Sequence, residues 1–368
     1  MRIAQLHVYR KIMAVKDVPC TMSGMTVWSV EKTIVRRVSD TWHERWGEVC
    51  PLGSLYAPVQ ASAIRAVMRE IGEFLVGGPI GANTVRQAID SLVNCGGYLH
   101  SAFDIAVHDL VGKSLGVPVA TLPGGVLSER LPSCFATGTE VPEKVAGIAR
   151  EKVEEGYPRI QIKIGGRDVA EDIASVRMVH EAAGSNARLA FDENGGLSMR
   201  DAIRVSRECV DVPFIFEQPC DSIREIATIR SQIRHPLYLD ESATNLATAI
   251  SAIFKGLVEG FGMKLSRLGG LRPFGAFMDV CAAHGLHYTC DDSRGGDIVA
   301  APRVQTAAAC EPRCLEGVWL ATPRIDDSDL SDTPVTVESG HISLPKGAGL
   351  GITPDSDRLG PPVASFGC

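Results

Sequence analysis

Five ionisable residues recur at a nearly constant interval in the second half of the chain. They are Lys163, Asp192, Glu217, Asp240 and Lys264, and the gaps between them are 29, 25, 23 and 24 residues. Each follows a short apolar run, and the interval is about the length that a strand, a crossover helix and two loops require. Because successive parallel strands end on one rim, we expect the five side chains to meet there.

The three acids in the middle of this series are candidates for a metal site. A single acid at such a position is more often an ordinary residue at the start of a helix. Three carboxylates on one rim, however, repel each other unless a cation offsets their charge. Ligand sets made only of oxygen favour Mg2+ over zinc. We therefore predict that Asp192, Glu217 and Asp240 hold Mg2+.

The two lysines flank the predicted metal site. Lys163 ends the second and Lys264 the sixth of eight predicted strands, so they lie on opposite sides of a closed ring. A nearby cation and partial burial lower the pKa of a lysine and make it a usable base. Two such bases could remove the α-proton of a metal-bound carboxylate and return it on the other face of the enediolate. Each lysine alone has the simpler interpretation of a solvated surface charge.

The remaining sequence predicts the elements that position these residues. Strands and helices alternate over residues 126–325, which favours a parallel (β/α)8 barrel. Residues 1–125 show strand patterns followed by helical patterns, which is typical of a small α+β domain. Residues 326–368 are rich in Pro, Gly, Ser and Asp, and we expect them to pack back toward the first domain. The eight predicted barrel strands are Ser133–Ala136, Ile160–Ile164, Leu189–Asp192, Phe214–Glu217, Leu237–Asp240, Gly262–Leu265, Tyr288–Cys290 and Glu316–Leu320.

Composition and charge exclude several classes of partner. The net charge of −7 and the isoelectric point near 5.8 argue against binding to nucleic acid or to an anionic membrane. The first residues lack the apolar core of a signal peptide, and no apolar stretch has the length of a membrane span. The 11 cysteines are scattered and odd in number, which indicates reduced thiols and a cytoplasmic location. The predicted metal and lysine positions, and not the composition, lead us to expect a small-molecule carboxylate as the partner.

The motifs around the five residues resemble those of the enolase superfamily, and within it the muconate-lactonizing-enzyme subgroup. The matching segments are Gln161–Gly165, Asp192–Asn194, Glu217–Pro219, Asp240–Ser242 and Lys264–Gly270. The resemblance covers nearly the whole chain and implies an α+β domain that caps the barrel, Mg2+, lysine bases and a homo-oligomer. One departure is Gln161, which stands where this subgroup usually has a lysine. It can hydrogen-bond a substrate carboxylate but carries no charge.

Further residues resemble the pocket of the epimerases of proline betaine and 4-hydroxyproline betaine. The residues concerned are Tyr56, Gln161, Asp291, Asp292 and Trp319. The resemblance implies that they contact the substrate, with the two aromatic rings flanking a cation. Core packing of Trp319 and a loop-anchoring role of Tyr56 explain these two residues equally well. Arg294 stands where an aromatic residue is expected, and it could repel a quaternary ammonium, point to solvent or bind a second anionic group.

Two residues next to the predicted ligands are expected to support them. Asn194 follows Asp192 by two residues and is predicted to orient a ligand water or carboxylate. Glu241 directly follows Asp240 and is predicted to support Lys264.

The sequence therefore predicts a Mg2+-dependent racemase or epimerase that acts through an enediolate on a proline-type amino acid or its betaine. A dehydratase acting on a hydroxyproline or a sugar acid is an alternative, because the same enediolate can expel a β-hydroxyl group. A third alternative is a barrel that binds a ligand without catalysis, which the intact metal and lysine positions oppose.

Overall fold

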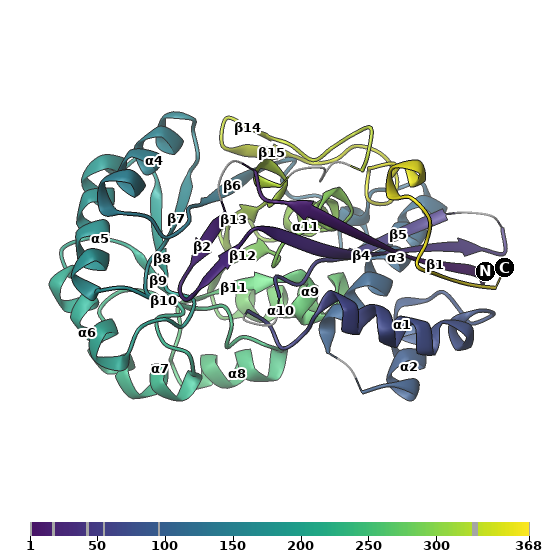
Figure 1. Ribbon diagram of the computed structural model, residues 1–368, viewed down its shortest axis with the longest axis horizontal. Coiled ribbons are helices and arrows are strands. Elements are labelled where there is room, and N and C mark those ends of the chain that lie inside the picture. Colours follow the sequence, from purple (N-terminus) through teal and green to yellow (C-terminus); the bar gives the residue numbers. More distant parts are fainter. Residues whose placement is uncertain are drawn as a thin grey trace.

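An antiparallel sheet and a closed parallel barrel make up most of the protein (Figure 1). The structure is a computed structural model, and it describes residues 2–16, 19–41, 44–53, 56–94, 96–325 and 330–367. The predicted start of the C-terminal segment, residue 326, lies outside the described residues. The fold class predicted from the sequence, a (β/α)8 barrel with an N-terminal α+β domain, is confirmed.

The first part of the chain and the final strand, β16 (Ala364–Phe366), form a four-stranded sheet in the order β16–β1–β4–β5. Residues of β1 and β4 such as Leu6, Val8 and Val35 share one apolar cluster with the helices α1, α2 and α3. Helix α3 ends at Gly116, whose φ of 71° suits a glycine. The bounds are β1 (Ile3–Ala14), β2 (Cys20–Met22), β3 (Met25–Val27), β4 (Ser29–Ser39), β5 (Glu44–Val49), α1 (Ala61–Leu75), α2 (Ala82–Leu92) and α3 (Gly97–Leu115).

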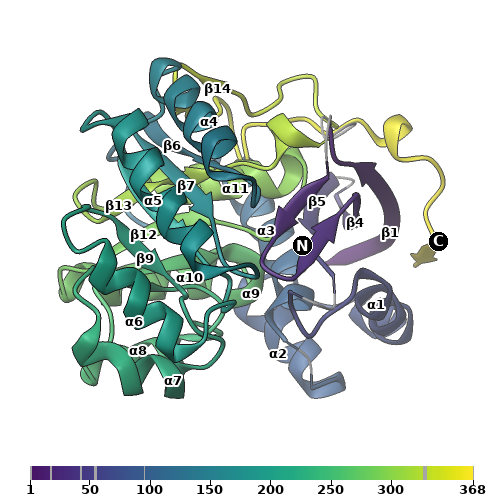
Figure 2. The same ribbon diagram turned by 60° about the vertical axis from the view of Figure 1, so that its left-hand side comes forward.

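Eight parallel strands, β6 to β13, close into a barrel because β13 pairs with β6. At least one α-helix links each strand to the next, and these helices surround the ring (Figure 2). The strands are β6 (Arg130–Ala136), β7 (Arg159–Lys163), β8 (Arg188–Asp192), β9 (Ile215–Glu217), β10 (Leu237–Leu239), β11 (Gly260–Lys264), β12 (His287–Asp291) and β13 (Leu315–Trp319). The helices are α4 (Pro142–Glu154), α5 (Val169–Ala183), α6 (Met199–Glu208), α7 (Ile223–Ile229), α8 (Leu246–Phe254), α9 (Leu265–Leu268), α10 (Leu271–Ala283) and α11 (Asp297–Ala308).

The hairpin of β2 and β3, which the sequence did not predict, lies over the mouth of the barrel. Cys20, Met22 and Val27 of this hairpin belong to one apolar cluster with Ala136 and Trp319, which end β6 and β13. The N-terminal domain thus sends a segment across the rim on which the predicted site residues lie.

The last part of the chain contacts both the barrel and the N-terminal sheet. The hairpin of β14 (Val337–Glu338) and β15 (His341–Ser343) pairs with β6 through β15. The final strand, β16 (Ala364–Phe366), pairs antiparallel with β1 and places Phe366 opposite Leu6. Short 3-10 turns lie at η1 (Val119–Thr121), η2 (Arg230–Gln232), η3 (Thr322–Arg324) and η4 (Ser356–Leu359).

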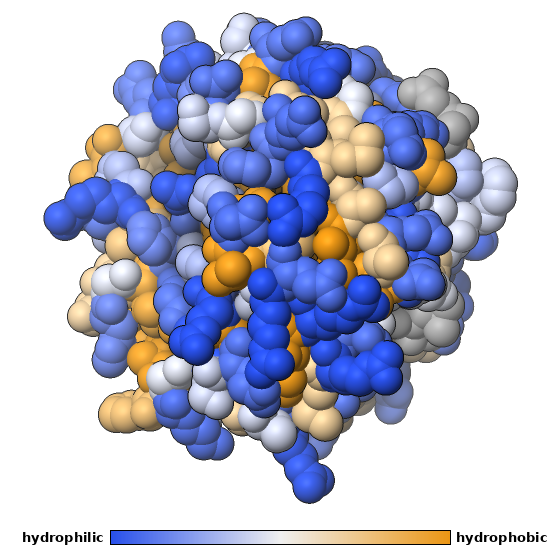
Figure 3. Space-filling view, turned by 90° about the vertical axis from the view of Figure 1, so that its left-hand side faces the viewer, coloured by the Kyte–Doolittle hydropathy of each residue, from blue (hydrophilic) through white to orange (hydrophobic). Residues whose placement is uncertain are grey.

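The side of the barrel that carries α4, α5 and α6 is shown in Figure 3. Hydrophilic side chains cover most of this face, and hydrophobic ones appear between them in small patches. In the part of the chain that the structure describes, no helix combines the length and the apolar content needed to span a bilayer.

Candidate active site

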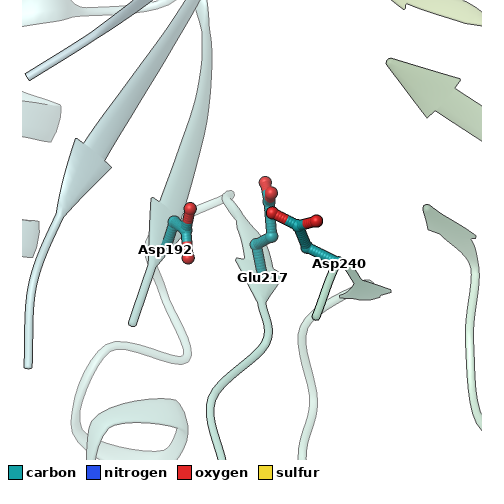
Figure 4. Close-up of side chains that lie close together, drawn as sticks. All are labelled: Asp192, Glu217 and Asp240. Atoms are coloured by element: carbon teal, nitrogen blue, oxygen red, sulfur yellow. The ribbon is translucent and has the colours of Figure 1, made fainter. Parts of the chain in front are cut away.

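Three carboxylates meet at the barrel mouth, where β8, β9 and β10 end (Figure 4). Asp192 ends β8 and is the register partner of Glu217, which ends β9, while Asp240 directly follows β10. One oxygen of each carboxylate lies within 4.8 Å of the others, and all three residues are 0% exposed. The structure thus brings together the three residues that the sequence predicted as metal ligands.

This donor set suits a hard divalent cation. Oε1 of Glu217 is buried and has no hydrogen-bond partner. Burial, together with the charge of Asp192, raises the pKa of Glu217 to about 8. A cation among the three carboxylates would remove this repulsion and would use the unpaired oxygen. Carboxylate oxygens with positions left for water or substrate are the surroundings that Mg2+ prefers in proteins.

Asp240 is held in its charged form by two cations. Burial alone would raise the pKa of Asp240, but Lys264 and Arg267 outweigh burial and keep it below its ordinary value. Nη1 of Arg267 lies 2.6 Å from both Oδ1 and the backbone oxygen of Asp240. The sequence analysis quoted Arg267 within the Lys264–Gly270 motif but gave it no role. Arg267 lies in α9, three residues after Lys264 at the end of β11, and this closeness in sequence to a predicted site residue could have indicated its role.

Lys163 and Lys264 lie on opposite sides of the ring. They end β7 and β11, which are four strands apart in the closed barrel, so β8, β9 and β10 lie between them. Lys163 pairs with Asp192, and Nζ of Lys264 lies 2.8 Å from Oδ2 of Asp240. Burial opposes the charge of each lysine, but the neighbouring carboxylates outweigh it and raise both pKa values. Both lysines line one cavity at the barrel mouth.

Gln161 and Tyr56, predicted to bind substrate, contact the acids of the trio. Nε2 of Gln161 donates to Oδ2 of Asp192 at 2.8 Å. The hydroxyl of Tyr56 donates to Oδ2 of Asp240 at 3.2 Å and accepts a hydrogen bond from Arg267 at 3.1 Å. Burial and the charge of Asp240 raise the pKa of Tyr56 well above its ordinary value, so the hydroxyl keeps its proton. Both side chains also line the cavity.

Asn194 and Glu241 form a bridge beside the trio. The backbone N–H of Asn194 donates to Oδ1 of Asp192 at 2.9 Å, and its Nδ2 donates to Oε1 of Glu241 at 2.9 Å. Burial raises the pKa of Glu241 to about 7. Among the described residues, no hydrogen bond or ion pair joins Glu241 to Lys264. Glu241 therefore contacts Asn194 in place of the lysine that it was expected to support.

Asp291 and Asp292 both line the cavity, but their carboxylates have different partners. Asp291 lies at the end of β12, 3.9 Å from Nζ of Lys264, and accepts a hydrogen bond from the backbone of Trp319 at 3.1 Å. Asp292 turns to Ser266 and accepts bonds from its hydroxyl at 2.7 Å and its backbone N–H at 3.2 Å. Of the two, Asp291 is the one whose carboxylate lies within 4.0 Å of Nζ of Lys264.

The two aromatic rings predicted to flank a substrate cation are covered by arginines. The guanidinium carbon of Arg294 lies 4.8 Å from the ring centroid of Trp319, and that of Arg267 lies 5.6 Å from the ring centroid of Tyr56. A guanidinium group of the protein thus lies over one face of each ring, and the prediction that the two rings flank a substrate cation stays a prediction. The loop positions of Tyr56 and Arg294 have no strand period that would set the direction of their side chains.

The comparison with known families agrees with this architecture. A family model described as "Enolase C-terminal domain-like" matches residues 144–358, which is more than half of the chain. The chain belongs to the enolase superfamily. The family resemblance drawn from the motifs is thereby confirmed, while the finer resemblance to the betaine epimerases stays a prediction.

Relatives within the superfamily carry out different reactions. The cis-3-hydroxy-L-proline dehydratase of Roseibium aggregatum is 30% identical over 370 residues, covering 100% of both chains. The hydrophobic dipeptide epimerase of Enterococcus faecalis is 25% identical, covering 96% of this chain and 100% of the relative. A crystal structure of an enolase superfamily member from Roseovarius nubinhibens, complexed with magnesium, matches with a TM-score of 0.93 at 26% identity, covering 99% of each chain.

Proposed function

We propose that the protein is a Mg2+-dependent racemase or epimerase that moves the α-proton of a small carboxylate substrate. The observation that carries this proposal is the placement of Lys163 and Lys264 on opposite sides of the acidic trio, along one cavity. Inversion at a carbon needs a base on each face, because the proton leaves from one face and returns to the other. The dipeptide epimerase among the relatives supports this reaction class.

The metal is part of the proposal because the residues fit it. Asp192, Glu217 and Asp240 would supply the ligands, including the unpaired oxygen of Glu217. A bound divalent cation would attract the substrate carboxylate, offset the negative charge that develops as the α-proton leaves, and lower the pKa values of both lysines. The magnesium complex of a structural relative supports this choice of ion.

The protein's own groups then perform the proton transfer. The neutral amine of one lysine takes the α-proton, and the ammonium of the other donates a proton to the opposite face of the carbon. In the reverse direction the two lysines exchange roles. Gln161 and Tyr56 hold the carboxylates of Asp192 and Asp240 in position through the bonds described above. Met22 of the β2–β3 hairpin lines the cavity and helps to exclude water from the reacting carbon.

A dehydratase is the second candidate, favoured by the 30% identity with the cis-3-hydroxy-L-proline dehydratase over the full length of both chains. One lysine would again remove the α-proton. The lysine on the opposite side, in its ammonium form, would protonate the β-hydroxyl group so that it leaves as water. Because this relative is named for a hydroxyproline, it supports a proline-type amino acid as the substrate. Its betaine has less support, because arginines already cover the rings of Tyr56 and Trp319.

Incubation with Mg2+ in D2O tests the proposal. The panel contains both stereoisomers of proline, hydroxyprolines, proline betaines, N-acyl amino acids, dipeptides and chiral dicarboxylic acids with an α-hydrogen, and the readouts are proton NMR and optical rotation. A racemase or epimerase exchanges the α-hydrogen and changes the optical rotation without forming a new functional group, whereas a dehydratase gives an unsaturated or keto product. Loss of exchange on addition of EDTA is the control for metal dependence. A protein that binds Mg2+ but exchanges no member of the panel would count against both reactions and favour a ligand-binding barrel.

A further inference from the structure

A buried arginine lines the cavity from the loop after β12, whereas the acidic trio lies at the ends of β8, β9 and β10. Arg294 lies in the loop between β12 and α11, is 9% exposed and lines the cavity with the two lysines. Its guanidinium carbon lies 4.8 Å from the ring centroid of Trp319, and its Nη2 contacts Sγ of Cys20 at 2.9 Å. Neither contact supplies a carboxylate that could form an ion pair with the arginine.

The acids that precede Arg294 in the same segment form no ion pair with it and have other hydrogen-bond partners. Asp291 is occupied by the backbone of Trp319, and Asp292 is occupied by the hydroxyl and the backbone N–H of Ser266. Within the described part of the chain, Arg294 forms no ion pair, and its contacts are those with Trp319 and Cys20. A guanidinium that is nine-tenths buried without a carboxylate partner is costly. An anionic ligand would remove that cost.

The loop that carries Arg294 is held in place from the N-terminal domain. Glu48 on β5 is 0% exposed, and its Oε1 accepts a hydrogen bond from the backbone N–H of Gly296 at 2.7 Å. The indole of Trp319 supports the plane of the guanidinium from β13. A fixed guanidinium loses little freedom when it binds a planar carboxylate through two parallel hydrogen bonds.

The charged residues along the cavity also favour an anionic ligand near Arg294. Lys163 and Lys264 are paired with Asp192 and Asp240 of the trio. Arg324, in the turn η3, lines the same cavity, donates to the backbone oxygen of Ala136 at 2.8 Å and forms no ion pair within the described residues. Within the described residues, Arg294 and Arg324 therefore line this cavity without an ion-pair partner, although Asp291 and Asp292 line it as well.

We propose that the substrate carries a second carboxylate group, which Arg294 binds at the wall of the cavity away from the acidic trio. This inference rests on the proposed function, in which the first carboxylate is bound by the cation at Asp192, Glu217 and Asp240. The ligand class is a dicarboxylic acid with an α-hydrogen beside the first carboxylate. A substrate with a quaternary ammonium at this end would meet the charge of Arg294 and be repelled.

Binding of inert diacids tests the proposal without any need for turnover. Isothermal calorimetry in the presence of Mg2+ compares succinate, glutarate and adipate with the monoamide of each acid, which has the same length and one charge fewer. We expect at least one diacid to bind roughly tenfold or more tightly than its monoamide. In Arg294→Gln this ratio should fall to about 1, and Arg294→Lys should keep part of it because it keeps the charge. Arg313→Gln, which alters an arginine with 87% exposure, should keep the full ratio.

Each result bears on the proposal. Equal binding of diacid and monoamide across the series, or an unchanged ratio in Arg294→Gln, would overturn it. Loss of the ratio in Arg324→Gln with retention in Arg294→Gln would overturn the assignment to Arg294. Arg294→Gln should unfold at a midpoint no lower than that of the parent protein and should bind Mg2+ with the parent affinity, which shows that the variant is folded. If the diacid preference is present but no acid exchanges its α-hydrogen, the proposed function fails, while the assignment of Arg294 as a carboxylate-binding residue stands.

Discussion

Arg159 contacts Glu217 inside the barrel, where Nη2 lies 3.3 Å from Oε2 of the carboxylate and each side chain is 1% exposed. Arg159 opens β7, and strand alternation places it on the same interior face as Gln161 and Lys163. The arginine thus approaches Glu217 from the end of the barrel opposite the mouth. Its contact fixes one oxygen of Glu217 and leaves Oε1, which is unpaired, available to a cation. A ligand held in this way needs little reorganisation when the metal binds.

Replacing Arg159 should destabilise the protein strongly. Arg159→Met leaves the buried Glu217 without this counter-charge, and removing one partner of a buried ion pair costs about 3–5 kcal/mol. We expect a clear fall in the thermal unfolding midpoint, measured in EDTA. Arg188→Met is the control, because Arg188 pairs with Glu316 at 2.6 Å but is itself 55% exposed, and Glu316 keeps a second cation in Arg159 at 4.0 Å, so we expect a smaller fall. Equal shifts in the two variants would contradict the prediction.

Gly262 leaves the space that the trio needs. A Cβ atom built on this residue of β11 would lie 2.8 Å from Oε1 of Glu217 and 3.2 Å from Cβ of Asp240. Because Arg159 holds the other oxygen of Glu217, the carboxylate cannot move away freely. We therefore expect Gly262→Ala to weaken Mg2+ binding about 10- to 100-fold, as measured by calorimetry.

The control for this variant is Gly275→Ala in α10, where a Cβ would have no atom within 4 Å. This change should leave the affinity for Mg2+ unaltered and should stabilise the helix slightly. Parent-like Mg2+ affinity in Gly262→Ala would show that Glu217 can be displaced without affecting the metal site.

The sequence was sufficient for residues whose positions follow from strand geometry. The interval between Lys163, Asp192 and Glu217 places each at the end of a parallel strand whatever else packs nearby, and the three are register neighbours in the structure. The alternation of side chains along β7 likewise sets the inward direction of Gln161. These positions depend on local periodicity, which one sequence shows directly.

Positions that depend on contacts between distant segments could not be predicted from the local periodicity of the sequence. Arg294 lies in a loop, and its orientation depends on Cys20, a residue 274 positions away. The pairing of Leu6 with Phe366 joins the two ends of the chain, and β16 is only three residues long, too short for a periodic signal. The hydroxyl of Tyr56 reaches Asp240 only because the N-terminal domain docks on the barrel mouth.

Replacing one lysine at a time should show which face of the α-carbon each lysine serves. In Lys163→Ala, the stereoisomer whose α-proton faces Lys163 should lose deuterium exchange by about 100- to 10,000-fold, while the opposite stereoisomer keeps it. Lys264→Ala should show the reverse preference, and interconversion of the stereoisomers should be lost in both. Proton NMR in D2O on each pure stereoisomer measures this.

Two further variants test whether the lysines act as bases. Lys163→Arg keeps the charge but not a usable base, so it should resemble Lys163→Ala in exchange. Lys255→Ala, at an exposed position after α8, should exchange both stereoisomers like the parent protein. If Lys163→Ala and Lys264→Ala lose exchange of the same stereoisomer, the two-base mechanism is wrong.

His235 is a buried neutral histidine that should make stability depend on pH. It is 5% exposed and stacks on Phe214 with ring centroids 3.8 Å apart. Nε2 lies 3.2 Å and 3.1 Å from the backbone oxygens of Cys209 and Val212 and therefore carries the proton. Nδ1 then accepts a hydrogen bond from Ser206 at 3.0 Å. A second proton on Nδ1 would break this bond, and burial lowers the pKa of His235 below the ordinary value of 6.5.

The sign of the pH effect follows from this lowered pKa. The unfolded chain takes up a proton at His235 near pH 6.5, whereas the folded chain does so only at a lower pH. The stability due to neutral His235 is therefore fully present above about pH 6.5 and is lost as the pH falls through the folded pKa. Thermal unfolding midpoints at intervals between pH 7.5 and pH 5, with constant Mg2+, should fall less steeply in His235→Phe than in the parent protein. His284→Gln, at an exposed position, should keep the parent slope, and an unchanged slope in His235→Phe would show that this histidine does not couple folding to pH.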